Sequence, residues 1–352
     1  NFEIIEVEPF DTKSTERYLD LKIKRLSLNS GLKNFIVHFT GGYPFYLEVI
    51  TDCLLKSNQL DLSDIIQDLL FESSGILNQR FSNYLKRFLD SSLSEQYLSI
   101  LYLISSGHNK FKDIAHILTK PKNKTPAKTH FGVNDGEEGI SFVPRNKIDL
   151  RINELLESDL IDKTGDFFKI NDRVFGFWLK FVYQKKSNSL TFDAKNQKVR
   201  FKNYIEEMLQ EFLANASKPI VERITELLRL FADDTIQIDK KRLKLDQFRE
   251  IKSLEFNNRN LEEGLIGRSN DSIWIVAFQH DMLTEDFVSE FSHECKRYRH
   301  KAQKKVIVTL KDIDANARLR ALEEKIWMWD INDLNQILDL FSKPRIIVNA
   351  LP

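Results

Sequence analysis

The hydrophobic pattern of this chain changes twice along its 352 residues, and the changes divide it into three blocks. The first block, residues 1–90, opens on alternating apolar and acidic residues and continues with apolar residues spaced three and four apart. The second block, residues 91–184, has three helical stretches followed by two short strand-like stretches. The third block, residues 195–352, alternates strand-like and helical segments after a polar linker at 185–198. A chain of this length exceeds one ordinary core, so the pattern predicts three domains.

The second block has a recognisable order of elements. Ser94 is a suitable N-cap for a first helix, a second helix follows at 111–118, and a third runs from about Lys147 to Ser158. Residues 160–170 then form a predicted hairpin. The polar stretch 119–146 reads as a long loop. Three helices followed by a hairpin is the order of a winged helix.

The third block predicts a mixed α/β sheet domain. Two amphipathic helices come first, and strand-like segments near 272–278, 306–308 and 326–329 then alternate with helical ones. The expected fold class of the whole chain is therefore multi-domain α/β.

Composition excludes several classes of protein. Lys plus Arg and Asp plus Glu each number 52, so no global charge field indicates a nucleic-acid or membrane partner. No apolar run approaches the roughly 20 residues that span a bilayer, and the opening residues lack the layout of a signal peptide. Cys53 and Cys295 lie far apart in helical patterns, as free thiols in a reducing compartment do. We expect a cytoplasmic protein without a membrane partner.

Several short strings resemble one family. Residues 39–47, which contain Gly41, Gly42 and Pro44, resemble the glycine-glycine-x-proline motif in the helical lid of prokaryotic STAND-type ATPases, relatives of AAA+ proteins. Residues 155–161 and 172–178 resemble the winged helix of that family and the aromatic helix that follows it. The third block resembles the PD-(D/E)xK restriction-endonuclease-like domain that ends one branch of these ATPases. The resemblance implies an ATPase lid at 1–90, a winged helix at 91–184 and a nuclease-like domain at 195–352.

A P-loop is missing from the sequence. Phosphate binding by a P-loop needs a glycine-rich turn that ends in Gly-Lys-Ser/Thr, and no such string occurs. The resemblance implies that the P-loop precedes Asn1, that ATP and Mg²⁺ belong to the full-length protein, and that this chain needs no cofactor. In the family the motif proline lies against the adenine, so Gly42, Tyr43 and Pro44 are candidates for one wall of a nucleotide pocket. The alternative is a helix-entry turn that binds nothing.

The nuclease-like domain lacks the residues of nuclease chemistry. That chemistry uses an aspartate and a Glu-x-Lys strand to hold Mg²⁺ and activate water. The resemblance aligns Gly264 with the aspartate, Ala277 with the glutamate and Gln279 with the lysine, so all three are replaced. Glu263, or Glu206 and Glu207 on the first helix, would be needed to rebuild a metal site. We therefore expect no catalytic residue in this chain, and a divergent metal-dependent DNA nuclease is the alternative.

A metal site elsewhere in this block is not expected. The potential ligands near its charged helix are His280, Asp281, His293, Glu294 and Cys295. His293 and Cys295 are two residues apart, which directs them to different sides of a helix, and no known metal-binding spacing is present.

The third helix of the second block is the candidate DNA-binding element. Lys147 and Arg151 lie one turn apart, Asn153 is a candidate for contacting a base edge, and Lys163 lies on the wing. We expect Lys147 and Arg151 on the face opposite Ile148, Ile152 and Leu155. Acidic neighbours dilute this patch, so a spacer or protein-contact role remains an equal alternative. The resemblance thus implies a regulatory, non-catalytic part of a STAND-type ATPase, for which we expect double-stranded DNA, a protein partner or another copy of itself as the partner.

Overall fold

The computed structural model describes residues 9–24, 26, 28–57, 61–89, 93–119, 143–183, 194–238, 241–298 and 302–348. The strand-like opening at 1–8 and most of the predicted loop at 119–146 and linker at 185–198 lie outside these residues. The chain divides into two compact units, Asn1–Leu213 and Ala214–Pro352. Their boundary falls within helix α11 (Ala194–Ala216), whereas the sequence placed the start of the third domain at residue 195. The described part is mixed α/β, and none of its helices has the length and apolar character needed to cross a membrane.

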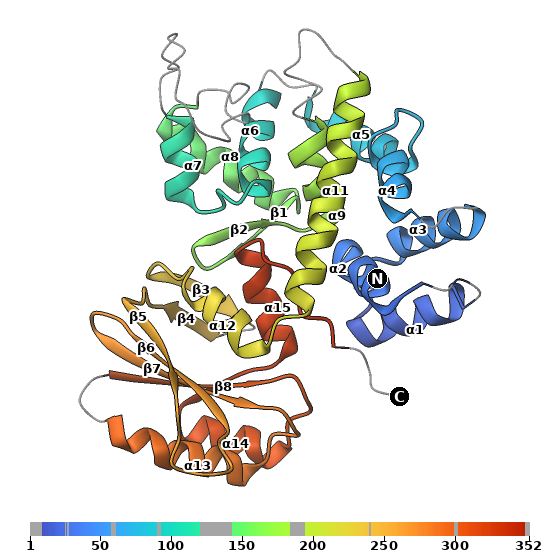
Figure 1. The fold of residues 1–352 in the computed structure, drawn as a ribbon. Helices are drawn as coiled ribbons and strands as arrows, with labels where there is room; N and C mark the ends of the chain where they lie inside the picture. The colour runs from blue at the N-terminus through green and yellow to red at the C-terminus, as the bar shows by residue number, and fades with distance from the viewer. Residues whose placement is uncertain are drawn as a thin grey trace, which may run out of the picture. The chain divides into compact units, whose positions relative to one another are not determined.

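The first unit begins with five helices (Figure 1). They are α1 (Thr12–Lys22), α2 (Ser30–Thr40), α3 (Pro44–Lys56), α4 (Leu62–Leu70) and α5 (Ile76–Leu89). Side chains of Asp11, Asn29 and Asp61 accept backbone N–H groups in the first turns of α1, α2 and α4, which satisfies donors that a helix start leaves unpaired. Apolar faces of these helices supply a core that includes the fully buried Leu19 and Leu47.

Three helices and a hairpin follow in the order that the sequence predicts. They are α6 (Ser94–Ser105), α7 (Phe111–Leu118), α8 (Arg145–Glu157), β1 (Ile161–Thr164) and β2 (Phe167–Ile170). The two strands pair antiparallel, and Lys110 forms a bridge to Phe167 that ties the start of α7 to the hairpin. The short helix α9 (Arg173–Trp178) and a π-helical turn η1 (Leu179–Tyr183) lead toward α11. Phe175 and Trp178 are buried, so the aromatic stripe on α9 packs inside the protein.

The second unit is built on a five-stranded sheet. Helix α12 (Ile220–Leu228) and the hairpin of β3 (Asp234–Ile238) and β4 (Lys241–Leu245) precede it. Its strands are β5 (Glu250–Leu254), β6 (Glu263–Arg268), β7 (Ser272–Gln279), β8 (Ala302–Thr309) and β9 (Ile326–Trp329), in that spatial order. Pairing is antiparallel from β5 to β7 and parallel from β7 to β9. The helical elements are α13 (Glu285–Cys295), η2 (Lys296–Tyr298), α14 (Ala315–Glu323) and α15 (Ile331–Leu340).

Strand β7 lies at the centre of this unit. Helices α13 and α14 lie side by side on one face of the sheet (Figure 1), where Ile275 and Ala277 of β7 join their apolar side chains in one core cluster. Trp274 is buried too and packs on Phe231 and Trp329, with ring centroids 6.0 and 5.9 Å away. A strand covered on both faces carries a continuous apolar run, which explains the sequence of residues 273–278.

Candidate functional site

The glycine-glycine-tyrosine-proline turn joins α2 to α3. Gly41 and Gly42 have φ angles of 63° and 84°, a backbone region that side chains disfavour, and Pro44 occupies the first turn of α3. The backbone N–H of Phe10 donates to the carbonyl of Gly42 at 2.9 Å, and a Cβ at Gly42 would lie 2.1 Å from the Phe10 carbonyl oxygen. Gly42 is therefore buried beneath the backbone of Phe10, whereas Tyr43 and Pro44 are half-buried. Their role as a nucleotide-pocket wall stays a prediction.

This turn is tied to the segment that leaves the hairpin. The aliphatic part of the Arg173 side chain lies 3.0 Å from the position of a Cβ at Gly41. The hydroxyl of Tyr46 donates to the carboxylate of Asp172, which also accepts the backbone N–H of Phe175 at 3.0 Å and so caps α9. Burial raises the pKa of both Tyr46 and Asp172 above their ordinary values. Asp172 thus joins the start of α3 to the start of α9.

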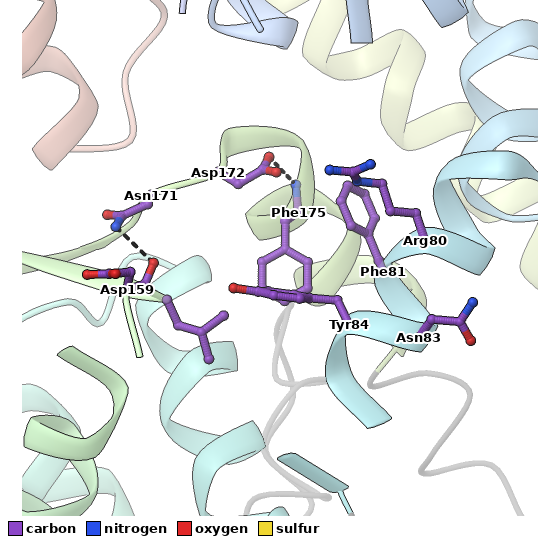
Figure 2. Close-up of a pocket in the computed structure, with 9 residues that line it drawn as sticks. Arg80, Phe81, Asn83, Tyr84, Asp159, Asn171, Asp172 and Phe175 are labelled. Carbon is purple, nitrogen blue, oxygen red and sulfur yellow. Dashed lines mark hydrogen bonds between the residues drawn. The ribbon is translucent and has the colours of Figure 1, made fainter. Parts of the chain in front are cut away.

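A cavity of about 500 Å³ lies beside Asp172. Figure 2 shows its lining side chains, which come from α5 and from residues 159–175. Phe81, Leu160 and Phe175 are buried, whereas Arg80 and Tyr84 of α5 are exposed at its edge. Sequence reasoning missed this cavity. The local signal in the sequence was Asp172 before the aromatic helix α9. The residues of α5 that form the other wall come much earlier in the chain, so no local pattern connects the two walls.

The structure separates the four candidate DNA-binding residues. Lys147 and Asn153 are exposed on α8, and Lys163 is exposed on β1. Arg151 is buried instead. Its Nη1 lies 2.7 Å from Oε2 of Glu154 and 3.3 Å from the hydroxyl of Tyr97, and its Nε lies 3.3 Å from Oε1 of Gln96. The expectation that Arg151 shares an exposed face with Lys147 is wrong. Residue 151 is three positions after Ile148 and four before Leu155, which places it beside the buried stripe.

The aligned nuclease positions lie together on β6 and β7. Gly264 and Ala277 are direct partners in the antiparallel ladder. A Cβ at Gly264 would lie 2.4 Å from the ring of Phe256, and Ala277 is fully buried in the core cluster under α13. Gln279 is half-buried, and its amide donates to the carbonyl of Met282 at 3.4 Å. Packed apolar groups therefore occupy the space that two carboxylates would need.

Among the carboxylates suggested as substitutes, Glu263 is the one that lies in the same unit as Gly264 and Ala277. Glu263 is opposite Phe278 in the ladder, and its exposed Oε2 lies 3.5 Å from Nε2 of His280. Glu206 and Glu207 belong to the first unit. In the part of the chain that the structure describes, no three His, Cys, Asp or Glu side chains form a group that could hold a metal ion. His293 is exposed whereas Cys295 is buried, and burial raises the pKa of the Cys295 thiol to about 12.

No family model matches the chain, and no curated protein matches it either. Among solved structures it is similar to a Walker-type ATPase of Pyrococcus abyssi, with a TM-score of 0.36 and 17% identity over 49% of this chain and 42% of that one. It is also similar to protein VC1899 from Vibrio cholerae, with a TM-score of 0.21 and 10% identity over 79% and 59% of the two chains. The chain is similar as well to Can2 from Sulfobacillus thermosulfidooxidans, solved in complex with cyclic tetra-adenylate. The TM-score is 0.17 and the sequence identity 12%, over 96% of this chain and 81% of that one. The chain thus spans less than half of the Pyrococcus protein, and similarities of this size assign no activity.

Proposed function

We propose that this chain is a regulatory, partner-binding portion of a STAND-type ATPase and supplies no catalytic residue. Its helices α1 to α5 would form the lid, residues 93–183 the winged helix and the second unit an inactive nuclease-like domain. The observation that carries the proposal is the pairing of Gly264 with Ala277. These are neighbouring positions on adjacent strands, where two carboxylates would share one cation, yet one is a glycine under Phe256 and the other a buried alanine.

The surroundings of Gln279 also support a non-catalytic domain. A cavity of about 480 Å³ beside it is lined by the carboxylates of Glu262, Asp281, Asp286 and Glu290, against the cationic Arg259 and the imidazole of His280. This excess of negative charge would repel the phosphates of DNA. A Lys at position 279 would offset that charge, whereas the neutral Gln does not.

We expect the full chain to leave plasmid DNA intact in Mg²⁺ or Mn²⁺, because the positions that should bind the cation carry no oxygen ligand. Conversion of supercoiled plasmid to nicked or linear forms, followed on agarose gels, measures this. A Glu263→Gln variant and a Lys252→Gln variant serve as a matched pair, since both change exposed side chains of the same sheet. Cleavage that disappears in the Glu263→Gln protein but persists in the Lys252→Gln protein would support the divergent nuclease instead.

The exposed face of α8 is the surface that we assign to a partner. It presents Arg145 and Lys147 against Asp149 and Glu157, so its named charges balance, and Leu150 is 45% exposed among them. An exposed leucine within a neutral face suits a protein surface better than a phosphate backbone. Double-stranded DNA is the second candidate partner because Lys147, Asn153 and Lys163 are all exposed.

Salt dependence separates these two candidates. If DNA binds here, two lysines neutralise about two phosphates, so log affinity should fall against log salt with a slope of about 1.8. Replacing Lys147 and Lys163 together by Glu should then abolish that slope, while Arg17→Glu on α1 should preserve it. Fluorescence anisotropy of a labelled duplex gives both quantities. Duplex binding that is unchanged in the double variant would exclude this face as the DNA reader and leave the protein-contact role.

A further inference from the structure

The cavity in Figure 2 has an apolar body. Phe81 and Phe175 are each 2% exposed, and their ring centroids are 5.3 Å apart. The ring of Tyr84 meets Phe175 edge-on at 5.6 Å, and Leu160 is buried beside it. Because these rings are held by one another, the wall exists before any ligand arrives. A volume of about 500 Å³ lies in the range of small-molecule sites.

Two opposite charges lie at one end of this cavity. Figure 2 shows the guanidinium of Arg80 and the carboxylate of Asp172 above the rings of Phe81 and Phe175. Arg80 is fixed with its guanidinium carbon 4.5 Å from the centroid of Phe45, and it forms no ion pair within the residues that the structure covers. Burial raises the pKa of Asp172, and the positive field of Arg80 partly offsets that rise. The two groups are thus close enough to interact, yet they do not bond to each other.

Each of these groups has capacity left for a ligand. A guanidinium presents five N–H donors in a planar fork that matches a carboxylate. The carboxylate of Asp172 accepts from Tyr46 and from the backbone N–H groups of Phe175 and Val174, and a carboxylate can accept about four hydrogen bonds, so capacity remains for one more. The exposed carboxylate of Asp159 also lines the cavity. An anion alone would pair with Arg80 but lie close to the Asp172 carboxylate, and an amine alone would pair with Asp172 but lie close to the Arg80 guanidinium. A zwitterion satisfies both.

We infer that this cavity binds a free α-amino acid with an apolar or aromatic side chain. The α-carboxylate pairs with Arg80, the α-ammonium pairs with Asp172, and the side chain lies against Phe81, Tyr84 and Phe175. The site does not depend on the regulatory function proposed above, since it needs neither ATP nor DNA. The hydrogen bond between Asp172 and Tyr46 would connect a bound amino acid to α3, the helix that begins after the glycine-glycine turn.

Ligand binding to the full chain tests this site directly. L-phenylalanine and L-leucine at millimolar concentration should raise the melting temperature and give saturable heats in calorimetry. 3-Phenylpropionate lacks the ammonium and phenethylamine lacks the carboxylate, so each should bind at least about tenfold more weakly, because one charged hydrogen bond is lost. Glycine should also bind more weakly, since it leaves the apolar wall uncovered.

Variants locate the ligand in the cavity. Arg80→Gln and Asp172→Asn should each weaken L-phenylalanine binding about tenfold or more, while Arg17→Gln, an exposed arginine on α1, should bind as the parent does. Asparagine is as good an N-cap as aspartate, so Asp172→Asn retains the start of α9. If that variant fails to fold, Arg80→Gln at an exposed position still decides the question. The inference is overturned if no amino acid binds, if either analogue binds as tightly as L-phenylalanine, or if Arg80→Gln binds it unchanged.

Discussion

Replacing Arg151 by Glu should destabilise the first unit by about 1–3 kcal/mol, between the value of an exposed ion pair and the cost of breaking a buried one. The Arg151 side chain is only 9% exposed, while that of its partner Glu154 is 37% exposed, which places the pair toward the weaker end. The new carboxylate would meet Glu154 and leave Tyr97 and Gln96 without their cation. Hydrogen bonds from Tyr97 and then Arg151 hold the pKa of Glu154 below its ordinary value. Glu154 therefore stays charged and repels the carboxylate introduced at position 151.

Hydrogen exchange of backbone amides in α6 and α8 measures this loss within the unit concerned. Lys147→Glu is the matched control on the same helix, because Lys147 is exposed and surface changes stay within about 0.5 kcal/mol. Equal protection in the two variants would mean that Arg151 is not held as the structure places it. The result also bears on DNA binding, since a charge reversal at residue 151 would weaken binding by unfolding the helix.

Introducing the missing nuclease glutamate by Ala277→Glu should cost more than about 4 kcal/mol and restore no activity. Ala277 is fully buried among apolar side chains that include Leu283, Phe287 and Phe291, and an isolated carboxylate there has no hydrogen-bond donor to replace water. Burial raises the pKa of such a carboxyl above its unfolded value. The cost therefore rises with pH from the unfolded pKa to the raised folded pKa and is largest above the folded pKa, so it should shrink as pH falls through that range and the group is protonated.

Exchange of amides in β7 and α13 reports the loss, with the parent protein measured at the same pH. Ala315→Glu makes the same substitution at an exposed residue in the first turn of α14, where an acidic side chain is neutral or slightly favourable. A folded Gly264→Asp, Ala277→Glu double variant that cleaves DNA with Mg²⁺ would contradict the packing argument. It would show that this strand pair still has room for a metal site.

Some elements could be predicted from the sequence because they depend on residues that are close together in the chain. The order of three helices and a hairpin at 94–170 follows from apolar spacings of three and four and from strand alternation, both of which are properties of neighbouring residues. The turn at Gly41 and Gly42 was equally readable, because only glycine adopts its φ angles readily and Pro44 suits a helix start. The strand at 272–279 was visible as an apolar run, although its two buried faces were not.

The sequence by itself indicated the helices and the hairpin of residues 94–170 and the strands near 272–278, 306–308 and 326–329, and it contains no P-loop and no aligned nuclease carboxylate. Only the tertiary structure decided that Arg151 is buried, because its partners Gln96 and Tyr97 lie more than 50 residues away on α6. The same holds for the cavity, whose charged pair joins Arg80 of α5 to Asp172. A helical pattern fixes the face of the helix on which a residue lies. Residues distant in the sequence decide what packs against that face, and this packing sets the burial and the charge environment of Arg151 and of the cavity.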